Sequence, residues 1–132
     1  MSAITQYAQL IGRALLAIIF IISGFGKITG FAGTAGYMAS KGVPMAEVLL
    51  IPTILIELGG GLMILLGWKA RWAALAIFLF LIPTTVIFHG PWQFPAAEAQ
   101  GQMIHFMKNL AIMGGMLLVF AHGSGPFSID KK

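Results

Sequence analysis

Four long apolar segments constrain this chain more than any other feature of its sequence. They cover residues 7–26, 45–66, 72–89 and 102–121. An α-helix needs ~20 residues to cross ~30 Å of hydrocarbon, and the segments suit that length. Of the 132 residues, 58% are hydrophobic and 9% are charged, whereas a soluble domain carries roughly 25% charged residues. The sequence therefore predicts an all-α integral membrane protein whose main solvent is the lipid bilayer.

The connections between these segments indicate an antiparallel bundle of four transmembrane helices. The second and third segments are joined only by "GWKAR", which is too short for anything but a hairpin. Between the first two segments, apolar residues at helical spacing end at Gly42 and Pro44, which predicts a short interfacial helix over residues 31–41. The connection "GPWQFPAAEAQG" predicts an irregular loop. We expect one membrane domain over residues 1–132.

The basic residues at the segment ends predict an orientation. One side of the bundle carries four of them, Lys69, Arg71, Lys131 and Lys132. The other side carries Lys27 and Lys41. By the positive-inside rule, both termini are expected in the cytoplasm. The formal net charge of +4 does not indicate a nucleic-acid partner, because the basic residues are scattered singly and form no patch.

Four polar residues interrupt the apolar segments: Arg13, Glu57, Lys108 and Asn109. A rise of 1.5 Å per residue places Arg13 roughly 9 Å, Glu57 roughly 14 Å and Lys108 roughly 20 Å from the cytoplasmic end. A charge at mid-bilayer costs on the order of 3 kcal/mol or more unless it faces the interior and pairs. We therefore predict a buried polar cluster in which Glu57 lies between the two cations and Asn109 bridges.

This cluster has two interpretations, and the sequence leaves both open. Ionisable groups within a membrane are usually functional, but buried polar networks also fix how helices pack. Glycines bear on the packing, because Gly60 and Gly61 lie beside Glu57 while Gly114 and Gly115 follow Lys108. Small residues let helices approach closely, so we predict a seam between the second and fourth helices.

A second group of polar residues lies near the far ends of the segments. Lys27, His89 and His105 are expected to surround a small pocket, with Phe31 and Trp92 as apolar neighbours and residues 31–40 as a roof. These side chains offer hydrogen-bond donors suited to a quinone carbonyl or a lipid-like ligand. Interfacial hydrogen bonding is the alternative role for both histidines. Two imidazoles without further ligands predict no metal site, and the absence of cysteine excludes thiolate and iron–sulfur sites.

Several separated motifs resemble the DoxX family over nearly the whole chain, in particular its small bacterial inner-membrane members. The motifs are "GR", "GFGKITGFAGTAGYM", "IELGGGLMILLGWKAR", "FMKNLAIMGG" and "GPFSID". The resemblance implies a four-helix protein of the bacterial inner membrane. Some DoxX-type proteins are linked to thiosulfate:quinone oxidoreductase, and others to membrane complexes with soluble oxidoreductases. The residues in the matching motifs are Arg13, Lys27, Glu57, Lys108 and Asn109.

Three classes of function follow from these observations. The first is a redox-associated membrane subunit or anchor that docks an oxidoreductase or interacts with quinone, and we favour it because of the resemblance. The second is a proton or small-solute pathway through the charged cluster, and the third is a structural or assembly protein. The sequence contains no phosphate-binding loop and no nucleophile with its base, so an accessory subunit is expected rather than a catalyst. Self-association into a homo-oligomer stays open.

Overall fold

The computed structural model describes residues 2–130, and its regular elements are all helical. In chain order they are α1 (Ala3–Thr29), α2 (Phe31–Ser40), α3 (Ala46–Ile54), the π-helix η1 (Leu55–Gly59), α4 (Gly60–Leu66), α5 (Ala70–His89), the 3₁₀-helix η2 (Pro91–Gln93) and α6 (Ala96–His122). Four helical stretches among these residues are long and apolar enough to cross a membrane: α1, α3 to α4, α5 to η2, and α6. The prediction of an all-α, four-span membrane protein is confirmed.

Two helices begin earlier than the hydropathy pattern indicates. In α1, the Ser2 side chain accepts a hydrogen bond from the Thr5 backbone N–H at 3.2 Å, and this cap extends the helix beyond its apolar part. In α6, the helix begins at Ala96, inside the segment that was expected to be irregular. Pro95 precedes a run of alanine, glutamate and glutamine, which are strong helix formers although they are not apolar. Hydropathy therefore located the membrane-crossing parts of these helices but not their ends.

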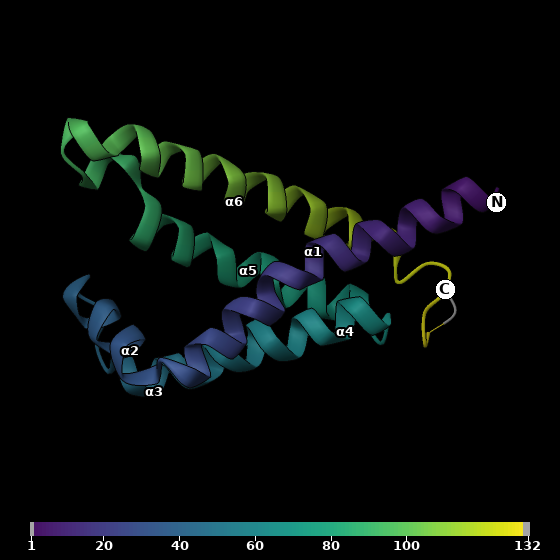
Figure 1. Ribbon diagram of the computed structural model, residues 1–132, viewed down its shortest axis with the longest axis horizontal. Helices are drawn as coiled ribbons and strands as arrows, with labels where there is room; N and C mark the ends of the chain where they lie inside the picture. The colour runs from purple at the N-terminus through teal and green to yellow at the C-terminus, as the bar shows by residue number, and fades with distance from the viewer. Residues whose placement is uncertain (1, 131–132) are drawn as a thin grey trace.

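The helices form two layers that meet at one end and diverge at the other (Figure 1). One layer contains α1, α2, α3 and α4, and the other contains the α5–α6 pair. The layers meet where a buried core gathers Ala17 and Phe20 of α1, Ile64 of α4, Ile77 of α5 and Met116 of α6. We call this the tail end, because residues 123–130 lie there. Figure 1 shows the layers separating toward the opposite end, which carries α2 and is called the α2 end.

The second membrane-crossing stretch is not a regular α-helix. Pro52 lies inside α3 and lacks the backbone N–H that would continue the hydrogen-bond ladder. The π-helix η1 follows directly and contains Glu57. Such wide turns in membrane and soluble helices are often found at functional sites. Because it inserts extra backbone into one turn, η1 changes which face of the helix the residues before and after it present.

Glycines lie at the close contacts between α1 and its neighbouring helices. A Cβ added to Gly24 would lie 2.8 Å from the backbone nitrogen of Leu58 in η1. A Cβ on Gly61 would lie 2.9 Å from Ile21 Cγ1, and one on Gly115 would lie 3.0 Å from Leu16. The predicted glycine seam between the second and fourth helices is therefore wrong. Both helices instead use glycine to approach α1.

These contacts predict different effects for two glycines only two residues apart in α1. Gly24→Ala should destabilise the protein by about 1–3 kcal/mol, because the added methyl group meets the η1 backbone. Gly26→Ala serves as a matched control, since a Cβ there meets nothing within 4 Å. It should leave stability unchanged or raise it by about 0.5–1 kcal/mol. Thermal unfolding in mild detergent measures both, and equal effects would show that α1 and η1 are not in close contact.

Candidate functional site

An ion pair joins the middle of the second membrane-crossing stretch to α1. The Lys27 Nζ atom lies 2.7 Å from Glu57 Oε1 and also donates a 2.6 Å hydrogen bond to Ser23 Oγ. The Glu57 side chain is 6% exposed and that of Lys27 is 25% exposed. The prediction that Glu57 needs a cationic partner holds, but its partner is Lys27 and the predicted pairing with Lys108 is wrong.

Local geometry explains why Lys27 reaches this carboxylate. Gly24 brings α1 into contact with η1 at Leu58, the residue after Glu57. Lys27 lies one turn further along α1, and long side chains on a helix lean back toward its N-terminus. The Lys27 ammonium therefore points back along α1 toward Glu57. Ser23 lies on the same face one turn earlier and supplies the second acceptor.

Lys108 lies elsewhere, on an exposed part of α6. Within residues 2–130, the structure shows no ion pair for it. The helix α6 packs mainly against α5, whereas Glu57 faces α1. The depth of Lys108 along α6 does not determine which face of the helix carries its side chain. Its side chain leans toward the N-terminal end of α6, so its ammonium can reach the α2 end of the membrane by snorkelling.

Arg13 is buried, but it does not contact Glu57. Its Nη2 atom donates to the backbone oxygens of Pro126 and Phe127, at 3.1 and 2.9 Å. Its Nη1 atom lies 3.4 Å from the backbone oxygen of Ile64. The acceptors for this cation are therefore main-chain carbonyls of the tail and of α4. Residues 126–127 lie more than a hundred positions away in sequence, so spacing gave no signal of this contact.

Asn109 also has a partner outside the predicted cluster. Its Nδ2 atom donates to Thr85 Oγ1 at 3.2 Å, which links α6 to α5. The four residues of the predicted cluster thus divide among three places. Arg13 holds the tail, Lys108 is exposed, and Glu57 and Asn109 line one cavity from opposite layers.

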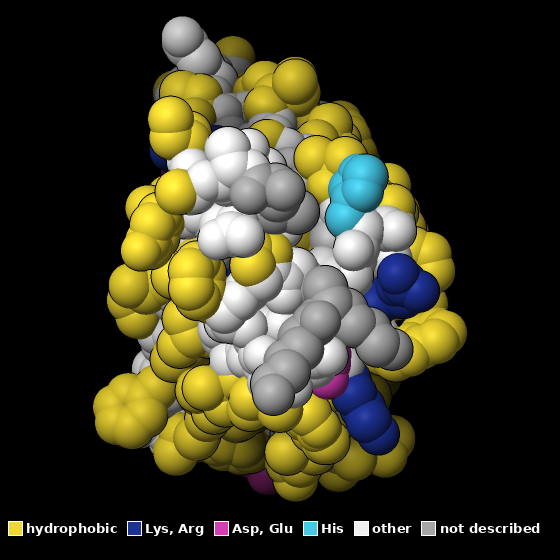
Figure 2. Space-filling model, turned by 90° about the vertical axis from the view of Figure 1, so that its right-hand side faces the viewer, with side chains coloured by type: hydrophobic (Ala, Val, Ile, Leu, Met, Phe, Trp, Pro, Cys, Tyr) yellow, Lys and Arg dark blue, Asp and Glu magenta, His cyan; other side chains and the backbone are white. Residues whose placement is uncertain are grey.

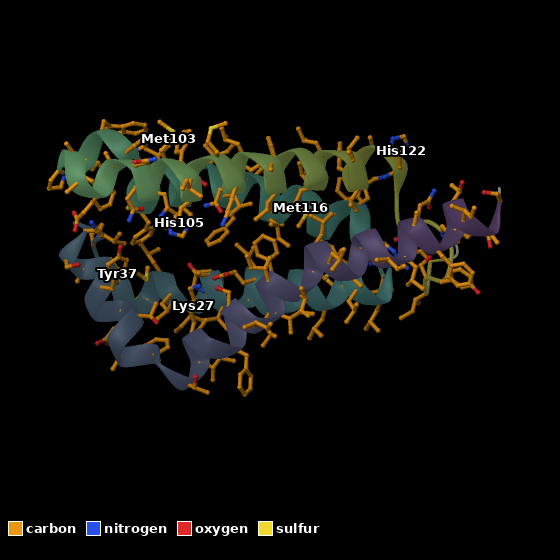
Figure 3. All side chains as sticks on the ribbon, turned by 45° about the horizontal axis from the view of Figure 1, so that its top comes forward. Lys27, Tyr37, Met103, His105, Met116 and His122 are labelled. Carbon is orange, nitrogen blue, oxygen red and sulfur yellow. The ribbon has the colours of Figure 1, made fainter. Side chains whose placement is uncertain are left out.

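The cavity has a volume of about 640 Å³ and lies where the two layers diverge. Its polar lining includes Lys27, Glu57, Asn109 and His89. Most of the remaining wall is apolar and comes from α1, α3, α5 and α6, together with Thr34, Tyr37 and Met38 of α2. Figure 3 shows Lys27 and Tyr37 on one layer and His105 on the other. A mostly apolar wall with a few convergent polar groups is typical of a ligand site.

A group of aromatic residues lies at the α2 end of the cavity. The Tyr37 ring of α2 stacks on Phe88 of α5, with centroids 5.6 Å apart and planes at 24°. The Lys41 ammonium lies 4.5 Å from the centroid of Phe94 and 5.8 Å from that of Tyr37. These contacts connect the α2 layer with the α5–α6 layer. Residues 31–40 were predicted to roof a pocket here, and α2 does supply cavity-lining residues.

The remaining residues predicted for the pocket lie around it. The His89 ring lines the cavity, and its Nδ1 donates a 2.9 Å hydrogen bond to Gln102 Oε1. The ring centroid lies 5.1 Å from that of His105. His105 is not a lining residue. Phe31 packs instead in the small core between α2 and α3. Trp92 is 67% exposed and packs edge-on against Phe106, so it is no part of the wall.

The ion pair predicts non-additive effects on stability. Lys27→Met should cost about 3 kcal/mol, because it leaves the buried Glu57 carboxylate without its partner. Glu57→Gln should cost less, because the Lys27 side chain that it leaves is 25% exposed. The double variant should recover part of that loss, giving a coupling energy well above about 0.5 kcal/mol. Melting of the four proteins in detergent measures the coupling.

Lys108→Met provides the control for this cycle. Combined with Glu57→Gln, it should give additive effects, because Lys108 is exposed and Glu57 is paired with Lys27. A large coupling between Glu57 and Lys108, with none between Glu57 and Lys27, would contradict the observed pairing.

Comparison with known proteins places this chain in a family. The sequence matches the DoxX family over residues 8–90, which include Lys27, Glu57 and His89. It is 43% identical to the inner membrane protein YqjF of Escherichia coli K12, over 99% of this chain and 95% of that protein. It is 37% identical to the inner membrane protein YphA of the same organism, over 93% of this chain and 88% of that protein.

More distant similarity extends to eukaryotic proteins. The Surfeit locus protein 4 homolog of Schizosaccharomyces pombe is 27% identical over 96% of this chain, which corresponds to 37% of that protein. No solved structure matches the chain. The two relatives of similar length are inner membrane proteins, and this chain has membrane-crossing helices. This chain therefore belongs to the DoxX family and is an inner-membrane protein.

Proposed function

We propose that this protein binds a quinone-type lipid in the cavity between its layers and acts as a redox-associated membrane subunit for an oxidoreductase. One observation carries the proposal: the ion pair between Lys27 and the buried Glu57 lines a mostly apolar cavity inside the membrane-crossing region. Holding two ions in such a place is costly unless they are fully hydrogen-bonded. A ligand that completes the hydrogen bonding of this pair would recover part of that cost.

The charge of the site favours a neutral ligand. Lys27 and Glu57 form a pair with no net charge, so an anionic ligand would compete with Glu57 for the ammonium. The ammonium has three donors, of which one bonds Ser23 Oγ, while Glu57 Oε1 lies 2.7 Å from the nitrogen as its counter-ion. A remaining donor suits a carbonyl oxygen, which is the acceptor that a quinone offers. Quinones are neutral and have flat rings, which match the apolar walls of the cavity.

Asn109 adds the complementary groups on the opposite layer. Its bond to Thr85 uses one of two amide N–H groups, and the side chain also has a carbonyl oxygen. An amide of this kind can donate to a quinone carbonyl or accept from a quinol hydroxyl. The two layers therefore suit both redox forms of the same molecule. We propose that a separate oxidoreductase supplies or removes the electrons, as the DoxX resemblance implies.

A proton or small-solute pathway is less favoured by the same geometry. Such a pathway needs polar groups or water from the ion pair to both ends of the bundle. Toward the tail end, however, the ion pair is followed by the buried apolar layer that includes Phe20, Ile64, Ile77 and Met116. Three of these four side chains have no exposed surface.

Matched lysine variants test quinone binding. Titration of the detergent-solubilised protein with a short-tailed ubiquinone should show saturable binding. The binding is measured as a rise in the melting temperature of the protein. Lys27→Met combined with Glu57→Gln should weaken binding about tenfold or more, because one charge-assisted hydrogen bond is lost. Lys108→Met should bind like the wild type, since that lysine does not line the cavity. No saturable shift in the wild type would reject the proposal.

We also propose that both termini face the cytoplasm. Lys69 and Arg71 are exposed at the tail end, with Trp68 and Trp72 beside them. Figure 2 shows basic side chains and a histidine at this end, bordered by hydrophobic side chains. This arrangement is typical of a cytoplasmic interface.

Reporter fusions test this orientation. A green fluorescent protein fused after residue 132 should be fluorescent in cells, and an alkaline phosphatase fused there should be inactive. The same reporters fused after Gly90, in the connection between α5 and α6, provide the control and should give the reverse result. An active phosphatase at the C-terminus would reverse the proposed orientation.

A further inference from the structure

The tail, residues 123–130, is joined to the bundle through its backbone. The Ile129 N–H donates to the Leu66 carbonyl oxygen at 3.0 Å. The Asp130 N–H donates to the Gly67 carbonyl oxygen at 3.0 Å. These contacts hold the tail beside the end of α4 (Figure 1). The segment contains no helix or strand, and segments of this kind open at lower cost than packed helices.

The tail covers one charged side chain, that of Arg13 in α1. This residue is 4% exposed, and its Nη2 atom donates to the carbonyl oxygens of Pro126 and Phe127 at 3.1 and 2.9 Å. Both acceptors are neutral, although a guanidinium forms its strongest hydrogen bonds with carboxylate and phosphate oxygens. The Arg13 Nε atom is also buried and has no hydrogen-bond partner among residues 2–130. The tail therefore satisfies this cation only in part.

The same contact is unfavourable for the backbone of the tail. Phe127 has a φ of 54°, in the left-handed region that residues other than glycine rarely adopt. Its ring stacks on that of Tyr7, with centroids 5.3 Å apart, while its carbonyl oxygen accepts from Arg13. The docked tail thus keeps a strained residue against an incompletely bonded cation. A group that bonds the cation better would shift the tail toward release.

The neighbours of Arg13 place its guanidinium near the lipid headgroups. Its Nη1 atom lies 3.4 Å from the carbonyl oxygen of Ile64, in the last turn of α4. That helix ends two residues later and is followed by Trp68, Lys69 and Trp72. Tryptophan and lysine are typical of the boundary between hydrocarbon and water. Phosphate groups of the bilayer are therefore available at this level.

The charges around the tail favour an anion once the tail has left. Asp130 is the acidic residue of the tail, and its Oδ2 atom accepts from the Lys69 backbone N–H at 2.6 Å. When the tail leaves, this carboxylate leaves with it. Arg71 borders the tail, because a Cβ added to Gly123 would lie 3.4 Å from its Nη2 atom. The side chains of Lys69 and Arg71 remain beside Arg13, so the released site attracts anions.

From these observations we propose that Arg13 is a binding site for an anionic phosphate group, and that the tail and the phosphate exclude each other. In the docked state, two carbonyl oxygens of the tail occupy Nη2 of the guanidinium. In the released state, two phosphate oxygens take their place and bond Nη2 and Nε together. A phospholipid headgroup and a free phosphate ion offer the same oxygens. The tail is thus a switch controlled by phosphate, and this role is independent of the ligand in the cavity.

A single cysteine reports the position of the tail, because the sequence contains none of its own. Ser124 is 3% exposed, so full-length Ser124→Cys should react slowly with N-ethylmaleimide while the tail is docked. Adding phosphatidylglycerol to phosphatidylcholine nanodiscs should raise this rate about fivefold or more. Ile129→Cys is the control, since Ile129 is 59% exposed while the tail is docked, and its rate should not rise.

Inorganic phosphate added to pure phosphatidylcholine nanodiscs separates the two sources of the anion. A rise in the Ser124→Cys rate with phosphatidylglycerol alone assigns the site to a lipid headgroup. A rise with inorganic phosphate shows that the free ion also binds. Equal rates in all of these conditions would overturn the proposal.

Two basic residues separate the Arg13 site from the general charge of the surface. Both substitutions are made in the Ser124→Cys protein. Arg13→Lys keeps the charge but lacks the planar fork, so it should lose most of the response to phosphatidylglycerol. Arg71→Gln removes an exposed charge beside the tail and should keep the response. A full response in Arg13→Lys, or its loss in Arg71→Gln alone, would overturn the Arg13 site.

Asp130→Asn tests the competition while leaving Arg13 intact. The change weakens the contact with the Lys69 backbone N–H, so less phosphatidylglycerol should be needed to release the tail. The measurement is the dependence of Ser124→Cys labelling on the phosphatidylglycerol content of the nanodiscs. An unchanged dependence would overturn the exclusion between tail and phosphate.

Discussion

The ion pair between Lys27 and Glu57 is the constraint on which the rest of the structure depends. Within the membrane-crossing region a carboxylate needs a partner, and this partner comes from α1. The pair is possible only because Gly24 lets α1 touch η1 at Leu58. Once α1 is held against the second membrane-crossing stretch at this level, these two helices act as one layer. The α5–α6 pair forms the second layer, and its buried core contacts with the first layer lie mainly near the tail end.

The cavity follows from this division into layers. At the tail end, alanines and Gly115 allow close packing, and large apolar side chains fill what space remains. At the α2 end, the layers are joined by the rings of Tyr37 and Phe88, which are long enough to meet across a wider gap. Between these two contacts lies the cavity. The ion pair therefore occupies the transition between a closed half and an open half of the bundle.

The sequence predicted the membrane-crossing helices well and the neighbours of their polar residues poorly. Hydropathy gave four helices, and the cost of a buried charge correctly required a partner for Glu57. Residue counting gave Lys108 a suitable depth, but it carries no information about which helices are neighbours or how far each is rotated. The π-helix η1 adds to the problem, because it rotates the residues that follow Pro52 relative to a regular helix. Lys27 was recognised as polar and assigned to the far-side pocket, although its lean toward the helix N-terminus was a usable sign that it reaches deeper.

Arg13 shows that the cost of burying a charge can be offset by contacts that sequence spacing does not reveal. Its two Nη atoms donate to main-chain oxygens of Pro126, Phe127 and Ile64, which any residue types could have supplied. The tail is held in place further by Asp130, which accepts from the Lys69 backbone N–H and from Ser124 Oγ. Carbonyl acceptors bring no opposite charge, so the contacts of Arg13 differ from the ion pair of Lys27 with Glu57. The ion pair lines the cavity, whereas Arg13 lies at the tail end.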